Sequence, residues 1–186
     1  MTGKLFIVAT PIGNLNDITF RAVDVLKNVD IVLAEDTRHS KKLFTHFEIS
    51  TPIRAFHEHN EREKTKAIID EIHSGKSIAL ISDAGTPLIS DPGYYLVAYA
   101  TKEGIDVTPI PGPSALITAL SASGLASDSF TFFGFLPSKQ TARVKFLQKL
   151  FSSSETIIFY ESPKRILATL TDMLSIFGDE REVCLA

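Results

Sequence analysis

The sequence is poor in cysteine, contains no long apolar run and has no excess of basic residues. Its single cysteine, Cys184, excludes an intramolecular disulfide and is typical of a reducing compartment. No segment approaches the roughly 18 apolar residues that span a bilayer. The first residues also lack the basic start and the cleavage site of a signal peptide. We therefore expect a soluble, cytoplasmic protein without a membrane partner.

The charge balance argues against a general affinity for nucleic acid. The chain has 19 Lys and Arg against 22 Asp and Glu, a net charge of −3. We expect no DNA partner, although local basic patches remain possible binding surfaces. Such patches occur at 37–46, 138–145 and 163–165. For each of them, a solvated helix face is the more common explanation.

Short apolar runs alternate with longer mixed runs in the first 112 residues, and this predicts an α/β fold. The mixed segments 60–75 and 90–104 have helical spacing and end in glycine, and Asp91 could cap the second of them. Repeated strand–helix units predict a mostly parallel five-stranded sheet with helices on both faces. The runs expected to form its buried strands are 4–10, 29–35, 53–57, 77–82 and 106–111.

The segment "PGP" at 111–113 separates this series from the rest. We expect a first domain over 1–112 and a second α/β domain over 113–186. Segments 129–135 and 156–160 predict strands, and 162–178 predicts a helix with Ser162 as N-cap and Pro163 in its first turn. The final "EVCLA" resembles the start of another strand. This ending suggests that the second domain is incomplete and that the chain is a fragment.

Two short motifs point to sites that the wider sequence does not support. The segment "SGKS" at 74–77 contains part of a phosphate-binding loop, but Asp70 stands where that loop needs glycine. His57 and His59 could form a metal pair, yet only Glu58, Glu61 and Glu63 accompany them in this window. We expect neither a phosphate-binding loop nor a metal site.

Three loops rich in proline and glycine are expected at one edge of the predicted sheet. They lie at 10–14, 83–87 and 111–115, each after a predicted strand. Ligands of parallel α/β sheets bind at the carboxyl ends of strands. None of the loops has the G-x-G-x-x-G pattern, which disfavours a nicotinamide enzyme. Asp36 and Arg38 follow the second strand at the same edge, where capping of a helix by this turn is an equally good explanation.

Seven segments taken together resemble one protein family. They are residues 8–22, 34–40, 57–61, 82–93, 111–125, 134–137 and 159–165. The most specific are "TPIGNLNDIT" at 10–19 and "SDAGTPLISDPG" at 82–93. They are similar to the ribosomal RNA small subunit methyltransferase I family, within the tetrapyrrole methylase superfamily. The resemblance covers essentially the whole chain.

This resemblance implies a two-domain α/β methyltransferase that binds S-adenosylmethionine between its domains and forms homodimers. The implied activity is methylation of the ribose 2′-hydroxyl of a cytidine in 16S ribosomal RNA of the small subunit. Many superfamily members have Gly-Asp-Pro where this chain has Gly85-Thr86-Pro87. The residues that the resemblance assigns to the methyl donor are Pro11, Asp83, Ala84, Gly85, Thr86, Leu88, Ile89, Ser114, Ala115, Phe135 and Leu136.

Methyl transfer to a ribose hydroxyl is assisted by a base that takes the hydroxyl proton. Asp36 and Glu161 are the candidate bases, because each is expected at a strand end facing the cleft. The residues expected to bind the RNA are Arg38, His57, Asn60, Lys164 and Arg165. Two alternatives stay open: a methyltransferase acting on a corrin or porphyrin precursor, and a non-catalytic nucleotide-binding module that docks on the ribosome.

Overall fold

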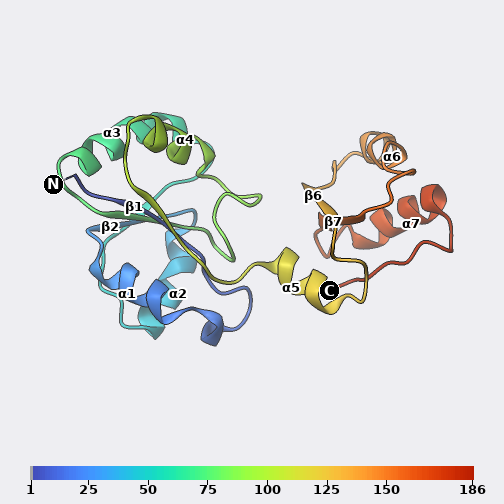
Figure 1. The fold of residues 1–186 in the computed structure, drawn as a ribbon, viewed down its shortest axis with the longest axis horizontal. Coiled ribbons are helices and arrows are strands. Elements are labelled where there is room, and N and C mark those ends of the chain that lie inside the picture. Colours follow the sequence, from blue (N-terminus) through green and yellow to red (C-terminus); the bar gives the residue numbers. More distant parts are fainter. Residues whose placement is uncertain (1) are drawn as a thin grey trace. The chain divides into compact units, whose positions relative to one another are not determined.

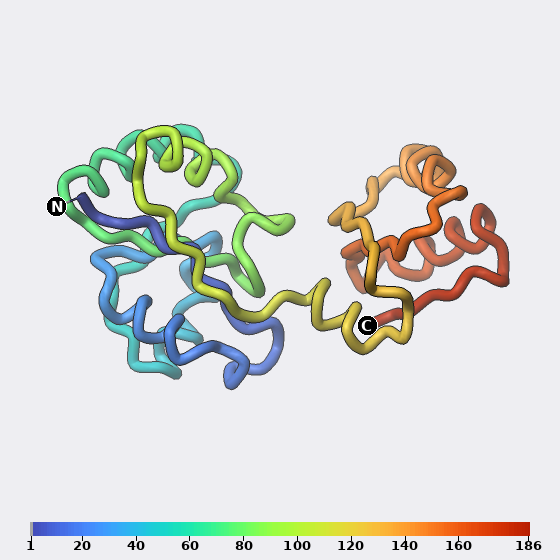
Figure 2. The backbone as a smooth tube through the Cα atoms, in the orientation of Figure 1, coloured from blue at the N-terminus to red at the C-terminus, as the bar shows by residue number. Residues whose placement is uncertain are grey.

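The computed structural model describes residues 2–186. It divides into two compact units, one ending at Ala115 and the other spanning Leu116–Ala186. The chain passes from one unit to the other once, as the trace in Figure 2 shows. The division falls three residues beyond the end of the domain expected from the sequence.

The first unit is built on a parallel sheet, and the α/β fold expected from the sequence is confirmed (Figure 1). Within residues 2–115 the sheet has five strands in the order β3-β2-β4-β1-β5. The edge strands β3 and β5 are only partly buried, which differs from the expectation of five buried strands, because each has a neighbour on one side only. The strands are β1 (Leu5–Val8), β2 (Ile31–Ala34), β3 (Ile53–Ala55), β4 (Ile78–Ile81) and β5 (Val107–Ile110).

Helices cover both faces of this sheet, as the sequence predicted. Alternate residues of each strand point to opposite faces. In β2, for example, Val32 packs in the core under α1 (Phe20–Asn28) and α2 (Thr37–His46). Its neighbour Leu33 packs in the core under α3 (Glu61–His73) and α4 (Tyr94–Lys102). Both cores are mainly aliphatic, with one buried phenylalanine in each, Phe44 in the first and Phe56 in the second.

The start of α4 differs from the expected cap. Gly93, not Asp91, is the N-cap, and it offers no side chain to the free amides of the first turn. The carboxylate of Glu61 supplies the missing acceptor from α3. Its Oε1 accepts hydrogen bonds from the backbone N–H of Tyr95 at 2.7 Å and of Leu96 at 3.3 Å. Asp91 is therefore not needed to stabilise the helix.

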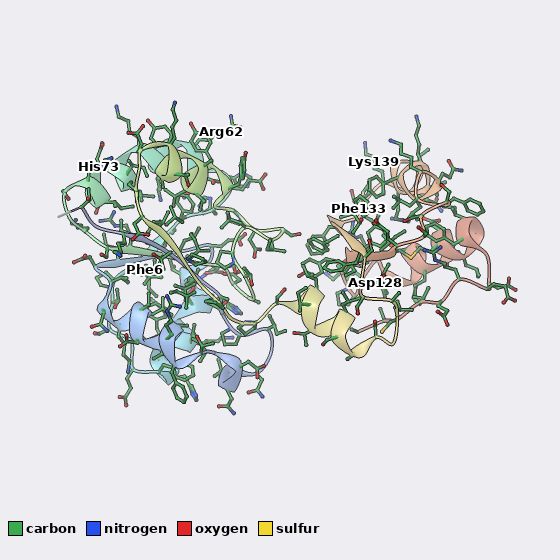
Figure 3. All side chains as sticks on the ribbon, in the orientation of Figure 1. Phe6, Arg62, His73, Asp128, Phe133 and Lys139 are labelled. Atoms are coloured by element: carbon green, nitrogen blue, oxygen red, sulfur yellow. The ribbon has the colours of Figure 1, made fainter. Side chains whose placement is uncertain are left out.

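The second unit has a two-stranded parallel sheet of β6 (Phe130–Phe135) and β7 (Thr156–Tyr160). It also contains α5 (Ala115–Ala122), which begins at the last residue of the first unit, α6 (Gln140–Gln148) and α7 (Ile166–Phe177). The ring of Phe133, labelled in Figure 3, packs edge-on against Phe146 of α6. A buried ion pair joins α6 to α7, with Arg143 Nη2 at 2.7 Å from Asp172 Oδ2.

The C-terminal expectations are partly wrong. The helix begins at Ile166 rather than at Pro163, since residues 163–165 form a turn and Arg165 is the N-cap instead of Ser162. Gly178 ends the helix as expected. Residues 182–186 are exposed and form no strand, because no neighbouring strand among residues 2–186 pairs with them. In the same described range no helix is long and apolar enough to cross a membrane.

Candidate active site at the carboxyl edge of the first sheet

The three loops rich in proline and glycine are tied to one another at the carboxyl edge of the sheet. The backbones of Thr10 and Gly85 exchange two hydrogen bonds, of 2.9 and 3.0 Å. The hydroxyl of Thr86 donates to the carbonyl oxygen of Pro113 at 3.0 Å. A Cβ on Gly112 would lie 2.9 Å from Cβ of Ala9, so these two strand ends approach too closely for any side chain there. The structure therefore brings these loops together.

The loop after β4 has a strained backbone. Leu88 and Ser90 have φ of 73° and 68°, in the left-handed region that side-chain-bearing residues rarely occupy. Each such residue costs of order 1–3 kcal/mol and persists only where its surroundings enforce it. Between them, Ile89 keeps 39% of its surface exposed. The loop thus holds an apolar side chain and several backbone polar groups in a fixed, accessible arrangement.

Most residues expected to hold the methyl donor belong to these loops. Thr86 and Gly85 make the contacts just described. The departure from the common Gly-Asp-Pro pattern has a structural use, because the Thr86 hydroxyl donates to the Pro113 carbonyl and an ionised aspartate could not. The others expected in the first unit are Pro11, Asp83, Ala84, Leu88, Ile89, Ser114 and Ala115.

An acidic cluster lies at the same edge. Glu35 follows β2, Asp83 follows β4, and Asp91 precedes α4. Burial and the charge of Asp83 raise the pKa of Glu35, while His57 opposes the change. Burial, followed by the charge of Glu35, raises the pKa of Asp91 to about 6, against a contact with the Ser82 hydroxyl that lowers it. The two carboxylates therefore titrate as a coupled pair, each with a raised pKa.

Asp36, one of the two expected bases, is tied to the start of α2. Its Oδ1 accepts a hydrogen bond from the backbone N–H of Arg38 at 2.8 Å, so Asp36 is the N-cap. That bond, and the Arg38 side chain, hold the pKa of Asp36 below its usual value. The Asp36 N–H in turn donates to Asp83 Oδ1 at 3.1 Å. Arg38 itself is 88% exposed.

His57 and Asn60 are brought together after β3. Asn60 Oδ1 accepts from the His57 N–H at 3.0 Å, and its Nδ2 lies 2.9 Å from His57 Nε2. The amide nitrogen can only donate, so in the neutral imidazole Nε2 accepts and the ring proton is on Nδ1. This Nδ1 is buried and has no partner among the described residues. Within residues 2–186 no group of three or more His, Cys, Asp or Glu is arranged to hold a metal ion.

In the second unit, Glu161 is fully engaged by its neighbours. Its carboxylate lies 2.5 Å from Arg165 Nη2 and accepts from the Thr169 hydroxyl at 2.7 Å. Burial raises the pKa of Glu161, but the bonds from Thr169 and the Ser162 N–H, with the Arg165 charge, outweigh it and leave the pKa lowered. Arg165 Nη1 also reaches the carbonyl oxygen of Leu136 at 3.4 Å.

The remaining predicted residues of the second unit differ in exposure. Phe135, at the end of β6, is 55% exposed, and its ring lies 5.6 Å from that of Tyr160. The side chain of Leu136 is buried, and Lys164 is exposed in the turn before α7. The structure thus joins Leu136, Glu161 and Arg165 within this unit.

Two carboxylates of the cluster, Glu35 and Asp91, are missing from the residues expected from the sequence. From the sequence, Asp91 is expected only as a helix cap, and Glu35 has no predicted role. Strand alternation was a usable signal: Ile31 and Leu33 face the α3 and α4 side, and the next residue in that series is Glu35. The alternation points it toward the side that carries Asp91 and His57.

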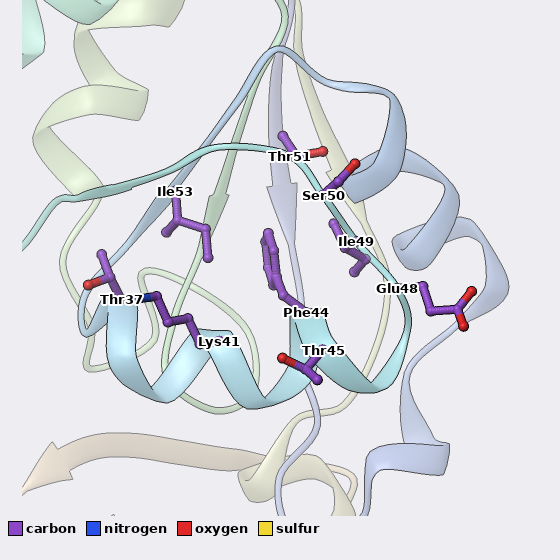
Figure 4. Close-up of a pocket in the computed structure, with 9 residues that line it drawn as sticks. All are labelled: Thr37, Lys41, Phe44, Thr45, Glu48, Ile49, Ser50, Thr51 and Ile53. Atoms are coloured by element: carbon purple, nitrogen blue, oxygen red, sulfur yellow. The ribbon is translucent and has the colours of Figure 1, made fainter.

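Two open hollows lie elsewhere, on either side of α2. One, of about 690 Å³, lies between α2 and the segment 48–53, with Lys41 extended along the helix toward Thr37 (Figure 4). The other, of about 470 Å³, lies between α2 and Leu15. Neither is lined by residues of the three loops.

Comparison with known proteins identifies the family. The sequence model of the "Tetrapyrrole (Corrin/Porphyrin) Methylases" matches residues 4–186. The chain belongs to this family. It is 60% identical over 182 residues to the "Ribosomal RNA small subunit methyltransferase I" of Vibrio cholerae, covering 98% of this chain and 63% of that protein. The protein of the same name from Xylella fastidiosa is 55% identical over 99% of this chain and 67% of its own length.

Within the superfamily, these matches place the chain in the ribosomal RNA small subunit methyltransferase I family. The chain spans slightly less than two thirds of the length of the Vibrio relative. A solved structure, a conserved hypothetical protein of Aeropyrum pernix K1, has a TM-score of 0.72 at 17% identity, over 97% of this chain and 68% of that one. The uroporphyrin III C-methyl transferase of Thermus thermophilus has a TM-score of 0.66 at 17% identity, over 96% of this chain and 79% of that one. These likenesses and the family match confirm the tetrapyrrole methylase-like fold.

Proposed function

We propose that the protein transfers a methyl group from S-adenosylmethionine to the ribose 2′-hydroxyl of a cytidine in 16S ribosomal RNA. The observation that carries this proposal is the 60% identity, over 98% of the chain, to a ribosomal RNA small subunit methyltransferase I. The joined loops and the acidic cluster at the carboxyl edge of the first sheet support it, because that edge is where parallel α/β sheets bind ligands.

The residues of the first unit fit the donor. Three loops held together by backbone bonds offer amide and carbonyl groups to polar parts of a ligand, and exposed Ile89 offers an apolar contact. The carboxylates of Glu35 and Asp83 supply negative charge for a cationic ligand. When bound, S-adenosylmethionine supplies an activated methyl group on a positively charged sulfur. The residues of this unit that would hold it are Pro11, Asp83, Ala84, Gly85, Thr86, Leu88, Ile89, Ser114 and Ala115.

Glu35 and Asp91 are better proton acceptors than the two carboxylates first expected. A general base works best when its pKa is near the working pH. Asp36 and Glu161 have lowered pKa values and are engaged in helix capping and an ion pair. The pKa of Asp91 is about 6, raised by burial and by Glu35. We assign proton acceptance to Glu35 and Asp91, with Arg38, His57, Asn60, Lys164 and Arg165 contacting the RNA.

Methyl transfer tests the function directly. The full-length protein would be titrated with S-adenosylmethionine by calorimetry and then supplied with tritiated donor and purified small ribosomal subunits. We expect label in a 2′-O-methylcytidine of the 16S RNA. Label in an added uroporphyrin or corrin precursor would instead support the activity after which the family is described. Binding of S-adenosylmethionine without methyl transfer to either acceptor would indicate that the protein is a non-catalytic binding module.

We also propose that the protein is a homodimer and acts in the cytoplasm. The second unit exposes large apolar side chains, including Phe151 at 63%, Leu167 at 79% and Leu174 at 58%. Exposed apolar groups of this kind support association with another surface. Light scattering on the full-length protein is expected to give twice the monomer mass, and a monomer mass across the concentration range would contradict the dimer.

A further inference from the structure

The outward face of α2 is the most uniformly basic helix surface in the first unit. Its sequence, TRHSKKLFTH, contains one Arg, two Lys and two His and no Asp or Glu. Ser40, Leu43 and Phe44 are its buried residues and face the sheet. The opposite stripe consists of Arg38, Lys41, Lys42, Thr45 and His46, all exposed. Residues three or four apart on a helix are neighbours, so this stripe is continuous along the helix.

The two lysine charges of this stripe have no ion-pair partner within the described structure. Lys41 and Lys42 form no ion pair with any of residues 2–186. Arg38 has a single, long contact of 3.4 Å to Asp36, with 88% of its side chain exposed. The basic residues of α3 alternate with acidic ones, in EREKTKAIIDEIH, on the other face of the sheet. The α2 surface therefore stands out in a chain whose net charge is −3.

Two open hollows flank the stripe, and their linings are mostly apolar, with the side chain of Glu48 at the first. The two hollows meet at α2, and Lys41 and Thr45 line both of them. The first is also lined by Thr37 and Ser50, and the second by exposed Leu15. The helix begins at Asp36, whose N–H donates to Asp83 of the acidic cluster. A strand lying along α2 would therefore lead directly to the candidate active site.

We propose that the basic stripe of α2 (Arg38, Lys41, Lys42 and His46) docks the phosphate backbone of the ribosomal RNA substrate beside the target nucleotide. This inference rests on the proposed function for the identity of the RNA. Phosphate contacts fix the position of a nucleic acid on a protein without reading its sequence. The stripe supplies the cations for such contacts, and the open hollows on both sides leave the lysines accessible.

Charge reversal tests the stripe. In the full-length protein, Lys41→Glu/Lys42→Glu is compared with Lys66→Glu/Lys102→Glu, which makes the same charge change at exposed positions of α3 and α4 on the opposite face. The probe is fluorescently labelled 16S RNA transcript, titrated over a series of salt concentrations. We expect the α2 variant to bind at least roughly tenfold more weakly, with a shallower dependence of log affinity on log salt, by about 1.5. The matched control should lose less than about threefold.

Several results would overturn the inference. Equal losses in both variants would mean that only overall charge matters, and no loss in the α2 variant would exclude the stripe. A loss on assembled small subunits without a loss on naked transcript would indicate a ribosomal protein as the partner. S-adenosylmethionine affinity, measured by calorimetry, should be the same in all three proteins. The wild-type protein could also bind the RNA through α2 and transfer no methyl group. That result would contradict the proposed function but not the RNA-binding role of the stripe.

Discussion

Replacing Asp91 by Asn is predicted to stabilise the protein above pH 6. The pKa of Asp91 is raised from 3.8 to about 6, first by burial and then by the charge of Glu35. At pH values between 3.8 and about 6, Asp91 therefore keeps its proton in the folded protein, whereas the same side chain has lost it in the unfolded chain. Stability falls as pH rises through this window, and the deficit persists at higher pH.

The magnitude follows from the size of the shift. One pKa unit corresponds to about 1.4 kcal/mol, so a shift of roughly two units makes ionised Asp91 unfavourable by at most about 3 kcal/mol. Asn keeps the shape and cannot ionise. Because Asp91 is only partly buried, solvent screening reduces this figure, and we expect Asp91→Asn to be about 1–2 kcal/mol more stable than wild type at pH 8. The difference should vanish as the pH falls below 3.8, where Asp91 becomes protonated in both the folded and the unfolded chain.

Urea unfolding followed by circular dichroism, at a series of pH values from 3.5 to 8, measures this difference. Carboxylates that do not interact with Asp91 titrate alike in both proteins, so their contributions cancel, whereas the coupling to Glu35 is part of the difference that is measured. The control is Asp36→Asn, because Asp36 has a lowered pKa and Asn caps a helix as well as Asp does. A difference between Asp91→Asn and wild type that does not change with pH would refute the reasoning.

Three further predictions concern single contacts. Glu61→Gln weakens the charge-assisted cap of α4 and should cost about 1–2 kcal/mol in urea unfolding, whereas an unchanged midpoint would mean that the cap contributes nothing. Arg143→Met leaves the buried carboxylate of Asp172 without its cationic partner and with only the Gln140 amide bonded to it, and should cost about 3–5 kcal/mol, with part of the loss recovered by adding Asp172→Leu. Gly93→Ala places a Cβ 2.6 Å from Cδ2 of Leu80 at a φ of 127° and should lower the melting temperature by several degrees.

The fold of the first unit is readable from the sequence because its buried strands and amphipathic helices have distinct periods. All five strands predicted there are present, and the helices ending near Gly75 and Gly104 were located correctly. The errors fall where a distant group overrides a local signal. Asp91 has the position of a helix cap, yet Glu61, thirty residues earlier, caps α4.

The candidate site is only partly predictable for the same reason. The Pro/Gly loops and Asp36 are marked by local sequence, whereas the raised pKa values of Glu35 and Asp91 depend on burial and on charges brought together from separate loops. The terminal segment 182–186 has strand-like composition but no neighbour to pair with in the described structure. Composition alone does not supply the hydrogen bonds of a sheet.

The assignment of Glu35 and Asp91 as proton acceptors is tested most directly by single-turnover transfer of tritiated methyl groups to purified small ribosomal subunits. Asp91→Asn should transfer at least roughly a hundredfold more slowly than wild type at pH 7.5, with unchanged affinity for S-adenosylmethionine, although it is the more stable protein. Asp36→Asn should stay within about threefold of wild type. Full activity in Asp91→Asn, or a large loss in Asp36→Asn alone, would contradict the account.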